Sequence, residues 1–435
     1  MLLQIKNVEE KSWDHLSAFM QELTQKLIHG ESAEALIAFA RAKEGIRGVA
    51  SFYYYLDQLQ NRGSLLYSAG DKTAPLATLV PMRSGFPFNE KLSLDRRYTL
   101  SRFCFIRREK EDLIIESPLS PAYVIMHRQE AHLLFRELRK GTTFSELCEQ
   151  FSNFPSKSIQ DYLILLNNLN AISLLGEEES LEQWEFHDLL FHSRNRIGRH
   201  DYPLGGCYPF RETAHPLPVT KTWPSFQPIL LYRPDLEVTK KQDPSFTEVL
   251  EKRCSVRSPS KALLNAELLG EFLYRTARIK QHMPTSIMDC SQRPSPAGGA
   301  IHELEIYAVI HQCEGLTSGI YHYDPDLHAL HQVTGKNPRM DRLLEDVRAS
   351  TMKEEFPQVL FVFTSRFQRL SWKYRAVSYA LTLKNVGALM QTMYLVATAM
   401  SLSPCAVGSG NSDLFSELIG SDYYEETSVG EFILS

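Results

Sequence analysis

The stretch that decides the fold runs from Ser371 to Gly410 and reads SWKYRAVSYALTLKNVGALMQTMYLVATAMSLSPCAVGSG. From residue 376 to residue 400, apolar side chains fall at nearly every angle of a 3.6-residue period, which predicts an α-helix buried on all sides. Lys373 and Tyr374, two side chains that can carry a proton, directly precede this helix. Pro404 and the glycines that follow it favour a close approach of the backbone to a ligand.

Length and composition indicate a globular protein of two or three domains. The 435 residues include 47 basic and 52 acidic ones, giving a net charge of −5 that argues against a nucleic-acid partner. No apolar run approaches the roughly 18 residues of a membrane span, and the N-terminus mixes acids and bases too early for a secretory signal. The seven cysteines contain no C-x-x-C pair, so we expect reduced thiols, a cytoplasmic location and no metal site.

The first half of the chain predicts two winged-helix-like domains, residues 1–95 and 96–180. The first combines three helices with a hairpin, expected at residues 16–29, 32–43, 49–60 and 64–81. The second places a hairpin before three helices and a strand, expected at residues 98–117, 129–139, 143–151, 158–170 and 171–175.

DNA binding, a common role of winged helices, is not expected here. The helix at 158–170 would read the groove, yet it contains no Lys or Arg. Two interpretations remain: the domains only pack, or a hairpin edge accepts an extended peptide as an added strand. Arg107, Arg108 and Lys110 near the hairpin turn suit an acidic peptide, or they are simply a solvated turn.

Residues 181–245 are rich in proline and predict a connector that runs over the surface of a domain. Arg194 and Arg199 belong to a basic cluster within it. They suit either a bound phosphate or carboxylate, or hydrogen bonds to the carbonyls of an irregular segment.

Chemistry is concentrated in residues 246–435, which we expect to form one domain. Arg253, Ser255 and Arg257 alternate, so in an extended segment they point to one side and suit a phosphate and the polar edge of a ring. After a helix at 266–276, RPSPAGG ends in Gly298 and Gly299, where missing side chains let the backbone approach a planar ring.

The rest of this domain predicts a strand, a hairpin and a final core strand. The first strand begins at Leu304, the hairpin turns at Asp324 and Pro325, and the final strand covers residues 358–365. His322, His328 and His331 straddle the hairpin without acidic or thiolate partners at ligand spacing, so no metal site is expected.

These motifs, in this order, resemble the streptolysin-type dehydrogenase branch of the nitroreductase superfamily. The resemblance covers residues 246–410, and the N-terminal half resembles the peptide-clamp or leader-recognition domains of cyanobactin oxidases. It implies an α+β fold with a C-terminal nitroreductase-like domain, and a homodimer with FMN at the subunit interface. The implied reaction is oxidation of thiazoline or oxazoline rings in a ribosomally made peptide to thiazole or oxazole.

The resemblance also assigns roles to individual residues. Lys373 and Tyr374 match a catalytic lysine-tyrosine pair. The FMN-binding positions are Arg253, Cys254, Ser255, Arg257, Ser295, Pro296, Ala297, Gly298, Val407 and Gly408. The chain has Ala380 and Ala388 where the family often carries Arg and His, which leaves the substrate side of the site open.

Lys373 is the expected base, because burial lowers the pKa of a lysine from its usual value of about 10.4. Tyr374 would be its proton partner or would orient the substrate. In the alternative reading, Lys373 binds FMN or a carboxylate and Tyr374 packs.

Two other functions remain open on the same fold. They are an NAD(P)H-dependent nitroreductase or quinone reductase, and a non-catalytic peptide-binding scaffold. The expected partner of the oxidase is an azoline-containing precursor peptide. A cyclodehydratase partner, and the preference between thiazoline and oxazoline, are left open.

Overall fold

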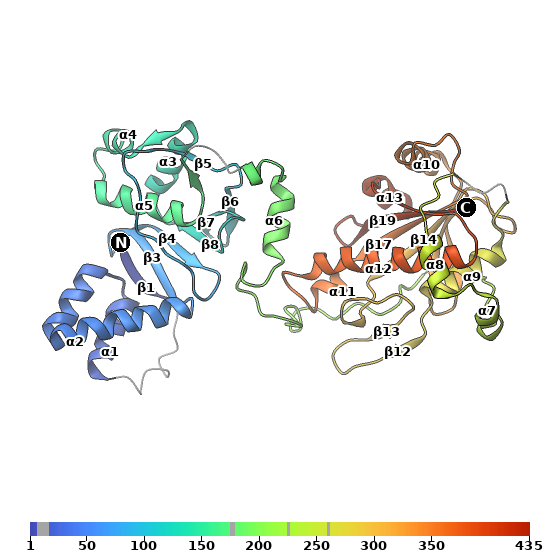
Figure 1. Ribbon diagram of the computed structural model, residues 1–435, viewed down its shortest axis with the longest axis horizontal. Helices are drawn as coiled ribbons and strands as arrows, with labels where there is room; N and C mark the ends of the chain where they lie inside the picture. Colours follow the sequence, from blue (N-terminus) through green and yellow to red (C-terminus); the bar gives the residue numbers. More distant parts are fainter. Residues whose placement is uncertain (7–16, 175–178, 224–226, 259–261) are drawn as a thin grey trace. The chain divides into compact units, whose positions relative to one another are not determined.

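The structure is a computed structural model that describes residues 1–6, 17–174, 179–223, 227–258 and 262–435. The chain forms two units, Met1–Tyr202 and Pro203–Ser435 (Figure 1). The division between them falls inside the predicted connector, residues 181–245. Leu16 and Leu175, which belong to the predicted first helix and to the strand at 171–175, lie outside the described residues.

An antiparallel seven-stranded sheet lies at the centre of the first unit, in the order β2-β1-β3-β4-β8-β7-β6. Its strands are β1 Leu2–Ile5, β2 Glu31–Ser32, β3 Leu65–Gly70, β4 Pro75–Pro81, β6 Phe105–Glu109, β7 Asp112–Glu116 and β8 Ala122–Met126. Because β4 pairs with β8, this sheet combines strands from both predicted winged-helix-like segments. The boundary at residues 95 and 96 stays a prediction.

The helices of this unit lie close to where the sequence predicts them. They are α1 Ala18–Ile28, α2 Ala33–Asn61, α3 Gln129–Glu137, α4 Phe144–Gln150, α5 Ser156–Asn168 and α6 Phe186–Arg194. The predicted break near residue 45 is a kink inside α2, where Gly45 adopts a left-handed φ of 61°. A second, small sheet joins β10 Ile172–Ser173, β5 Arg97–Leu100 and β9 Thr142–Thr143.

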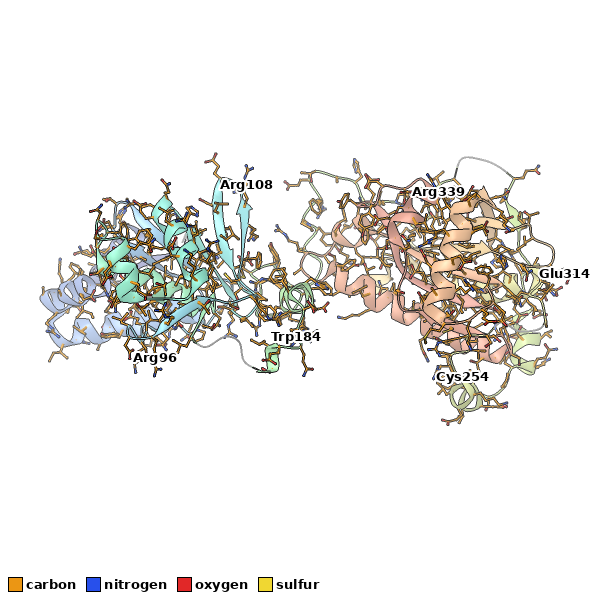
Figure 2. All side chains as sticks on the ribbon, turned by 90° about the horizontal axis from the view of Figure 1, so that it is seen from above. Arg96, Arg108, Trp184, Cys254, Glu314 and Arg339 are labelled. Carbon is orange, nitrogen blue, oxygen red and sulfur yellow. The ribbon has the colours of Figure 1, made fainter. Side chains whose placement is uncertain are left out.

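Arg107, Arg194 and Arg199 of this unit are held by other groups of the protein itself. Arg107 pairs with Glu109 and Glu116 along the β6–β7 hairpin, while Arg108 is exposed on it (Figure 2). Arg194 donates to the carboxylate of Glu116 and to three backbone carbonyls. Arg199 donates to two more carbonyls, those of residues 118 and 119. Of the two interpretations of Arg194 and Arg199, the structure therefore supports the hydrogen-bonding one.

The second unit contains another antiparallel seven-stranded sheet, in the order β11-β16-β15-β14-β17-β19-β18. Its strands are β11 Ile229–Leu230, β14 Leu304–Ile310, β15 Gly319–Asp324, β16 Ala329–Gly335, β17 Val359–Arg366, β18 Pro404–Val407 and β19 Glu426–Leu434. The hairpin at Asp324 and Pro325 and the strands beginning near Leu304 and Val359 are confirmed. A separate pair joins β12 Gln281–Met283 to β13 Cys290–Gln292.

Helices cover both faces of this sheet (Figure 1). The helices of this unit are α7 Leu236–Gln242, α8 Phe246–Lys252, α9 Ala266–Ala277, α10 Pro338–Thr351, α11 Phe367–Ser371, α12 Ser378–Ala399 and α13 Ser412–Ile419. The alternation of β14 explains the two layers: Ile306 packs in a core with α9 and α12, and Tyr307 packs in a core with α10 and α13. Both faces of the central strands are buried, as their continuous apolar runs require.

Helix α12 lies where it is predicted, but one expectation about it is wrong. It is not buried on all sides in the single chain, because Tyr379 is 45% exposed and Leu383 is 42% exposed, with Gly387 also exposed. The opposite side of the helix, including Val386 and Leu389, lies in the core. The apolar character all round the helix therefore includes a face that is partly exposed in the described part of the chain.

Among the helices of the described ranges, none has both the length and the apolar character that crossing a bilayer requires.

Candidate functional site

Lys373 and Tyr374 lie in the turn between α11 and α12. Local hydrogen bonds fix the conformation of this turn, because the backbone N–H groups of Lys373 and Tyr374 donate to the carbonyl of Leu370, at 3.1 and 2.8 Å. Both side chains are half-buried, and Lys373 Nζ lies 5.4 Å from the centroid of the Tyr374 ring. The predicted catalytic pair is therefore two adjacent side chains that share one environment.

Gly299 lies directly against this pair. It sits in a short 3-10 turn, Gly298–Ala300, with a left-handed φ of 63°. A Cβ atom placed on Gly299 would lie 2.5 Å from Tyr374 Oη and 2.9 Å from Lys373 Nζ. The missing side chain leaves the phenol and the amine room to meet the backbone beside the predicted ring-binding loop, residues 295–298.

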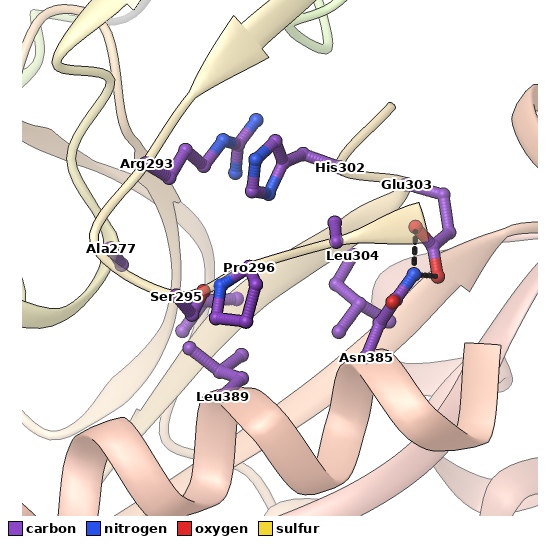
Figure 3. Close-up of a pocket in the computed structure, with 11 residues that line it drawn as sticks. Ala277, Arg293, Ser295, Pro296, His302, Glu303, Leu304, Asn385 and Leu389 are labelled. Atoms are coloured by element: carbon purple, nitrogen blue, oxygen red, sulfur yellow. Dashed lines mark hydrogen bonds between the residues drawn. The ribbon is translucent and has the colours of Figure 1, made fainter. Parts of the chain in front are cut away.

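A buried polar pair holds this loop to α12. The Asn385 side chain accepts a 3.0 Å hydrogen bond from Gly298 N and donates to both carboxylate oxygens of Glu303, each at 3.0 Å (Figure 3). Glu303 is fully buried, and burial raises its pKa against the opposing effect of the Asn385 hydrogen bond. Sequence reasoning missed both residues, although an asparagine inside an apolar helix is the signal that could have found Asn385.

The pocket in Figure 3 lies beside this loop and is too small for a ring system. Its volume is about 20 Å³, room for about one water molecule. Arg293 lines it, and its Nε and Nη2 atoms are buried without a partner in the described part of the chain. Together with Glu303 and His302, it forms a charged layer beside the loop rather than a ligand pocket.

The charged layer predicts a pH effect at His302. Burial, together with the charges of Arg293 and Arg369, lowers the pKa of His302 to about 3. Between about pH 6.5 and 3, the His302 side chain binds a proton in the unfolded chain but not in the folded chain. The free energy of unfolding therefore falls by up to about 1.4 kcal/mol for each unit by which the pH is lowered through this range. We expect His302→Gln to lose less unfolding free energy than the wild type between neutral and mildly acidic pH in urea titrations. Parallel pH dependences in the two proteins would contradict this assignment.

Arg253, Cys254, Ser255 and Arg257 follow α8 in an irregular segment beside β18. Val256 N donates to the carbonyl of Pro404 at 2.8 Å, which holds the segment there. Cys254, Ser255 and Arg257 are exposed and Arg253 is half-buried. Figure 2 shows Cys254 on the surface of its unit.

Tyr394 of α12 links this segment to the end of β18, a role that sequence reasoning missed. Its Oη lies 2.8 Å from Ser255 Oγ and accepts a 2.7 Å hydrogen bond from Ala406 N. Arg253 lies over the Tyr394 ring, 5.5 Å from its centroid. The predicted residues at 253–255 and at 407–408 are therefore neighbours.

Val407 and Gly408 border a hollow of about 260 Å³ at the end of β18, beside residues 428–431 of β19. A Cβ atom placed on Gly408 would meet nothing within 4 Å, so open space lies beside its backbone. Burial raises the pKa of Glu431, which lines the same hollow.

The structure arranges the predicted site residues in two groups along α12. Lys373, Tyr374 and the loop at 295–298 lie near Asn385, whereas the segment at 253–257 and the end of β18 lie near Tyr394. Tyr394 follows Asn385 by nine positions in the helix, a rise of roughly 14 Å. The single chain therefore does not bring all these residues into one pocket.

The donor groups of the second group fit a phosphate-bearing cofactor such as FMN. In the described ranges, the guanidinium groups of Arg253 and Arg257 have no hydrogen-bond or ion-pair partner in the protein. Two unpaired guanidinium groups beside the Ser255 hydroxyl suit a phosphate. No cluster of three or more His, Cys, Asp or Glu side chains arranged for a metal ion occurs in the same ranges.

Comparison with known proteins agrees with this architecture. Residues 98–201 match the family of the cyanobactin oxidase ThcOx, and residues 250–431 match the nitroreductase family. The protein MJ1384 of Methanocaldococcus jannaschii, named as a nitroreductase, is 24% identical to this chain over 179 residues. These residues are 40% of this chain and 82% of MJ1384.

Two further similarities are to a trifolitoxin-processing protein and to a chain of a microcin synthetase complex. The trifolitoxin-processing protein TfxB of Rhizobium leguminosarum bv. trifolii is 25% identical over 142 residues, which are 32% of this chain and only 38% of TfxB. A chain of the E. coli microcin synthetase McbBCD complex, solved with truncated pro-MccB17 bound, is 19% identical with a TM-score of 0.35. The match covers 56% of this chain and 90% of that one.

The family matches confirm the resemblance seen in the motifs and the α+β fold class. The chain carries a domain of the cyanobactin oxidase ThcOx type followed by a nitroreductase-family domain.

Proposed function

We propose that the protein is an FMN-dependent oxidase that converts thiazoline or oxazoline rings in a ribosomally made peptide to thiazole or oxazole. The observation that carries the proposal is the contact of the Gly299 turn with Lys373 Nζ and Tyr374 Oη. It places an amine and a phenol beside the loop proposed to border the flavin. The pairing of a ThcOx-type domain with a nitroreductase-family domain supports the same reaction class.

The chain's own residues would bind the cofactor from both groups. Arg253, Ser255 and Arg257 would hold the phosphate, the ribityl chain and the pyrimidine edge. The backbone at Val407 and Gly408, and the loop at 295–298 on the other side, would border the ring. When bound, FMN supplies the acceptor for the hydride that leaves the azoline ring.

Lys373 and Tyr374 would handle the proton. Aromatising an azoline removes a proton from Cα along with the hydride from the neighbouring ring carbon, so a base must face the substrate. Lys373 Nζ would take that proton, and Tyr374 Oη would orient the substrate or pass the proton on. Asn385 and Glu303 would keep the adjoining loop in place.

A second copy of the chain would complete the site. Helix α12 has a partly exposed apolar face that includes Leu383 and Gly387, and the two groups of site residues are separated along the same helix. A homodimer in which each copy supplies one group explains both observations. The exposed face thereby accounts for a helix that is apolar on every side.

The first unit would bind the precursor peptide. Strand β6 lies at the end of the sheet order and pairs with β7 on its other side. An edge strand of this kind can accept an extended peptide by main-chain hydrogen bonds. The similarity to the trifolitoxin-processing protein supports a peptide substrate. The partner that we propose is a cyclodehydratase, which would make the azoline rings in that peptide.

Flavin reduction under anaerobic conditions tests the proposal. The FMN-loaded protein should lose its yellow absorbance on mixing with an azoline peptide and no nicotinamide. Rapid bleaching by NAD(P)H without any peptide would instead indicate a nitroreductase or quinone reductase. Failure to bind FMN at all would indicate a scaffold subunit.

A further inference from the structure

The chain segment of residues 206–218, at the beginning of the second unit, lies along the turn that carries Lys373 and the residues just before it. Cys207 N and Tyr208 N both donate to the carbonyl of Lys373, at 2.9 and 3.1 Å. The Tyr208 ring packs edge-on against Trp372, with ring centroids 5.6 Å apart. This segment, which is part of the predicted surface connector, is therefore hydrogen-bonded to the turn between α11 and α12 that carries Lys373 and Tyr374.

Further contacts hold the rest of the segment to the residues just before Lys373. Trp372 Nε1 donates to Ala214 O at 2.8 Å, Arg369 donates to Leu217 O, and Arg366 donates to Pro218 O at 3.0 Å. Arg366 and Arg369 are both buried. The segment thus follows the chain from Arg366 to Lys373 and takes a hydrogen bond from several of its side chains.

Gly206 contacts the Lys373 side chain directly. A Cβ atom placed on Gly206 would lie 3.2 Å from Lys373 Cε and 3.3 Å from Lys373 Cγ. The Lys373 side chain therefore runs between two glycines, with Gly206 against its methylene groups and Gly299 against its amine.

Lack of space, rather than backbone conformation, explains the glycine at position 206. Its φ lies outside the left-handed region that favours glycine, unlike the φ of 72° at its neighbour Gly205. Gly205 in turn has nothing within 4 Å of a built Cβ. The two adjacent glycines therefore serve different purposes: Gly205 permits the turn, and Gly206 makes room for the lysine.

We propose that Gly206–Tyr208 is a wall of the active site that positions Lys373, so that its amine stays at Gly299 and Tyr374. Gly206 is then a positioning residue, which acts through the lysine rather than on the substrate. The inference rests on the proposed oxidase function for its effect on catalysis. Its geometric part, the confinement of Lys373, can be measured without any turnover.

Gly206→Ala tests this inference by moving the lysine. The nearest atoms to a Cβ at 206 belong to the side chains of Lys373 and Tyr208 and not to the backbone, so folding and FMN content should stay those of the wild type. We expect azole formation to slow by about tenfold, because a Cβ 3.2 Å from Lys373 Cε makes the lysine give way by a few tenths of an ångström, less than the displacement of about 1 Å that can cost about a hundredfold. The pH profile of kcat should change as well.

A second measurement needs no enzymatic activity. The acylation rate of Lys373 by an amine-reactive reagent, read by peptide mass spectrometry, should change about tenfold or more in Gly206→Ala, because its confinement changes. Gly335→Ala is the matched control: the same substitution in the same unit, with ordinary φ and nothing within 4 Å of the new Cβ. It should leave both measurements unchanged.

The outcomes separate this inference from the oxidase proposal. If the wild-type protein makes no azole, but Lys373 acylation differs between the wild type and Gly206→Ala, the oxidase proposal is contradicted. The inference that Gly206 positions Lys373 is then still supported. Unchanged acylation and unchanged turnover in Gly206→Ala would overturn the wall. If Gly206→Ala gives little soluble protein, Tyr208→Leu removes the packing on Trp372 without adding bulk at 206, and the same two measurements decide.

Discussion

Lys373→Ala is expected to give a yellow, FMN-loaded protein that forms azoles at least about a hundredfold more slowly than the wild type. A positioned general base contributes roughly 10²–10⁴-fold to a rate, and alanine has no group that could accept the Cα proton. The Lys373 amine lies beside Tyr374 and Gly299, away from the arginines proposed to hold the phosphate. Turnover and flavin absorbance, measured on the same preparation, check both parts of the prediction.

Lys353→Ala is a suitable control, because Lys353 is an exposed lysine of the same unit. It should retain both flavin and turnover. Colourless Lys373→Ala protein would reassign the lysine to cofactor binding, and yellow protein with wild-type turnover would remove it from the mechanism.

Gly299→Ala is expected to be nearly as damaging. The new Cβ would lie 2.5 Å from Tyr374 Oη and 2.9 Å from Lys373 Nζ, so the phenol, the amine or the loop must move. Displacing a reacting group by about 1 Å can cost about a hundredfold in rate. The left-handed backbone adds a stability cost of roughly 1–2 kcal/mol. Turnover and urea unfolding of the purified variant measure the two effects separately.

Gly420→Ala separates the backbone effect from the contact. Gly420 has a similar left-handed φ of 68°, but a Cβ placed there meets nothing within 4 Å. It should show a comparable loss of stability with turnover intact. Equal turnover in Gly299→Ala and Gly420→Ala would show that the Gly299 contact does not matter for catalysis.

Much of the second unit could be predicted because its signals are local. The apolar run at 376–400 located α12 to within two residues at each end, Ser378–Ala399. The Asp324–Pro325 turn located the β15–β16 hairpin. Periodicity and turn chemistry report on neighbours in sequence, which is what helices and hairpins are made of.

Long-range pairing in the first unit could not be predicted in the same way. The hairpins were visible, but the pairing of β4 with β8, which joins them in one sheet, depends on residues more than 40 positions apart. β1 also escaped notice as a short strand near the N-terminus. Register between distant strands is set by packing that a single sequence does not display.

The site shows the same division. The motifs located the residues at 253–257, 295–298 and 373–374, while the polar links that hold them in place were missed. Asn385 contacts Glu303, 82 positions away, and Tyr394 contacts Ser255, 139 positions away. A lone Asn or Tyr in an apolar helix signals a buried partner without saying which residue it is.

The mass of an azoline-containing peptide after incubation with the FMN-loaded protein in air decides whether the protein oxidises azoline rings. We predict that each azoline ring loses the mass of two hydrogen atoms, with wild-type protein and not with Lys373→Ala. A peptide mass that stays unchanged with yellow, folded wild-type protein would contradict this prediction.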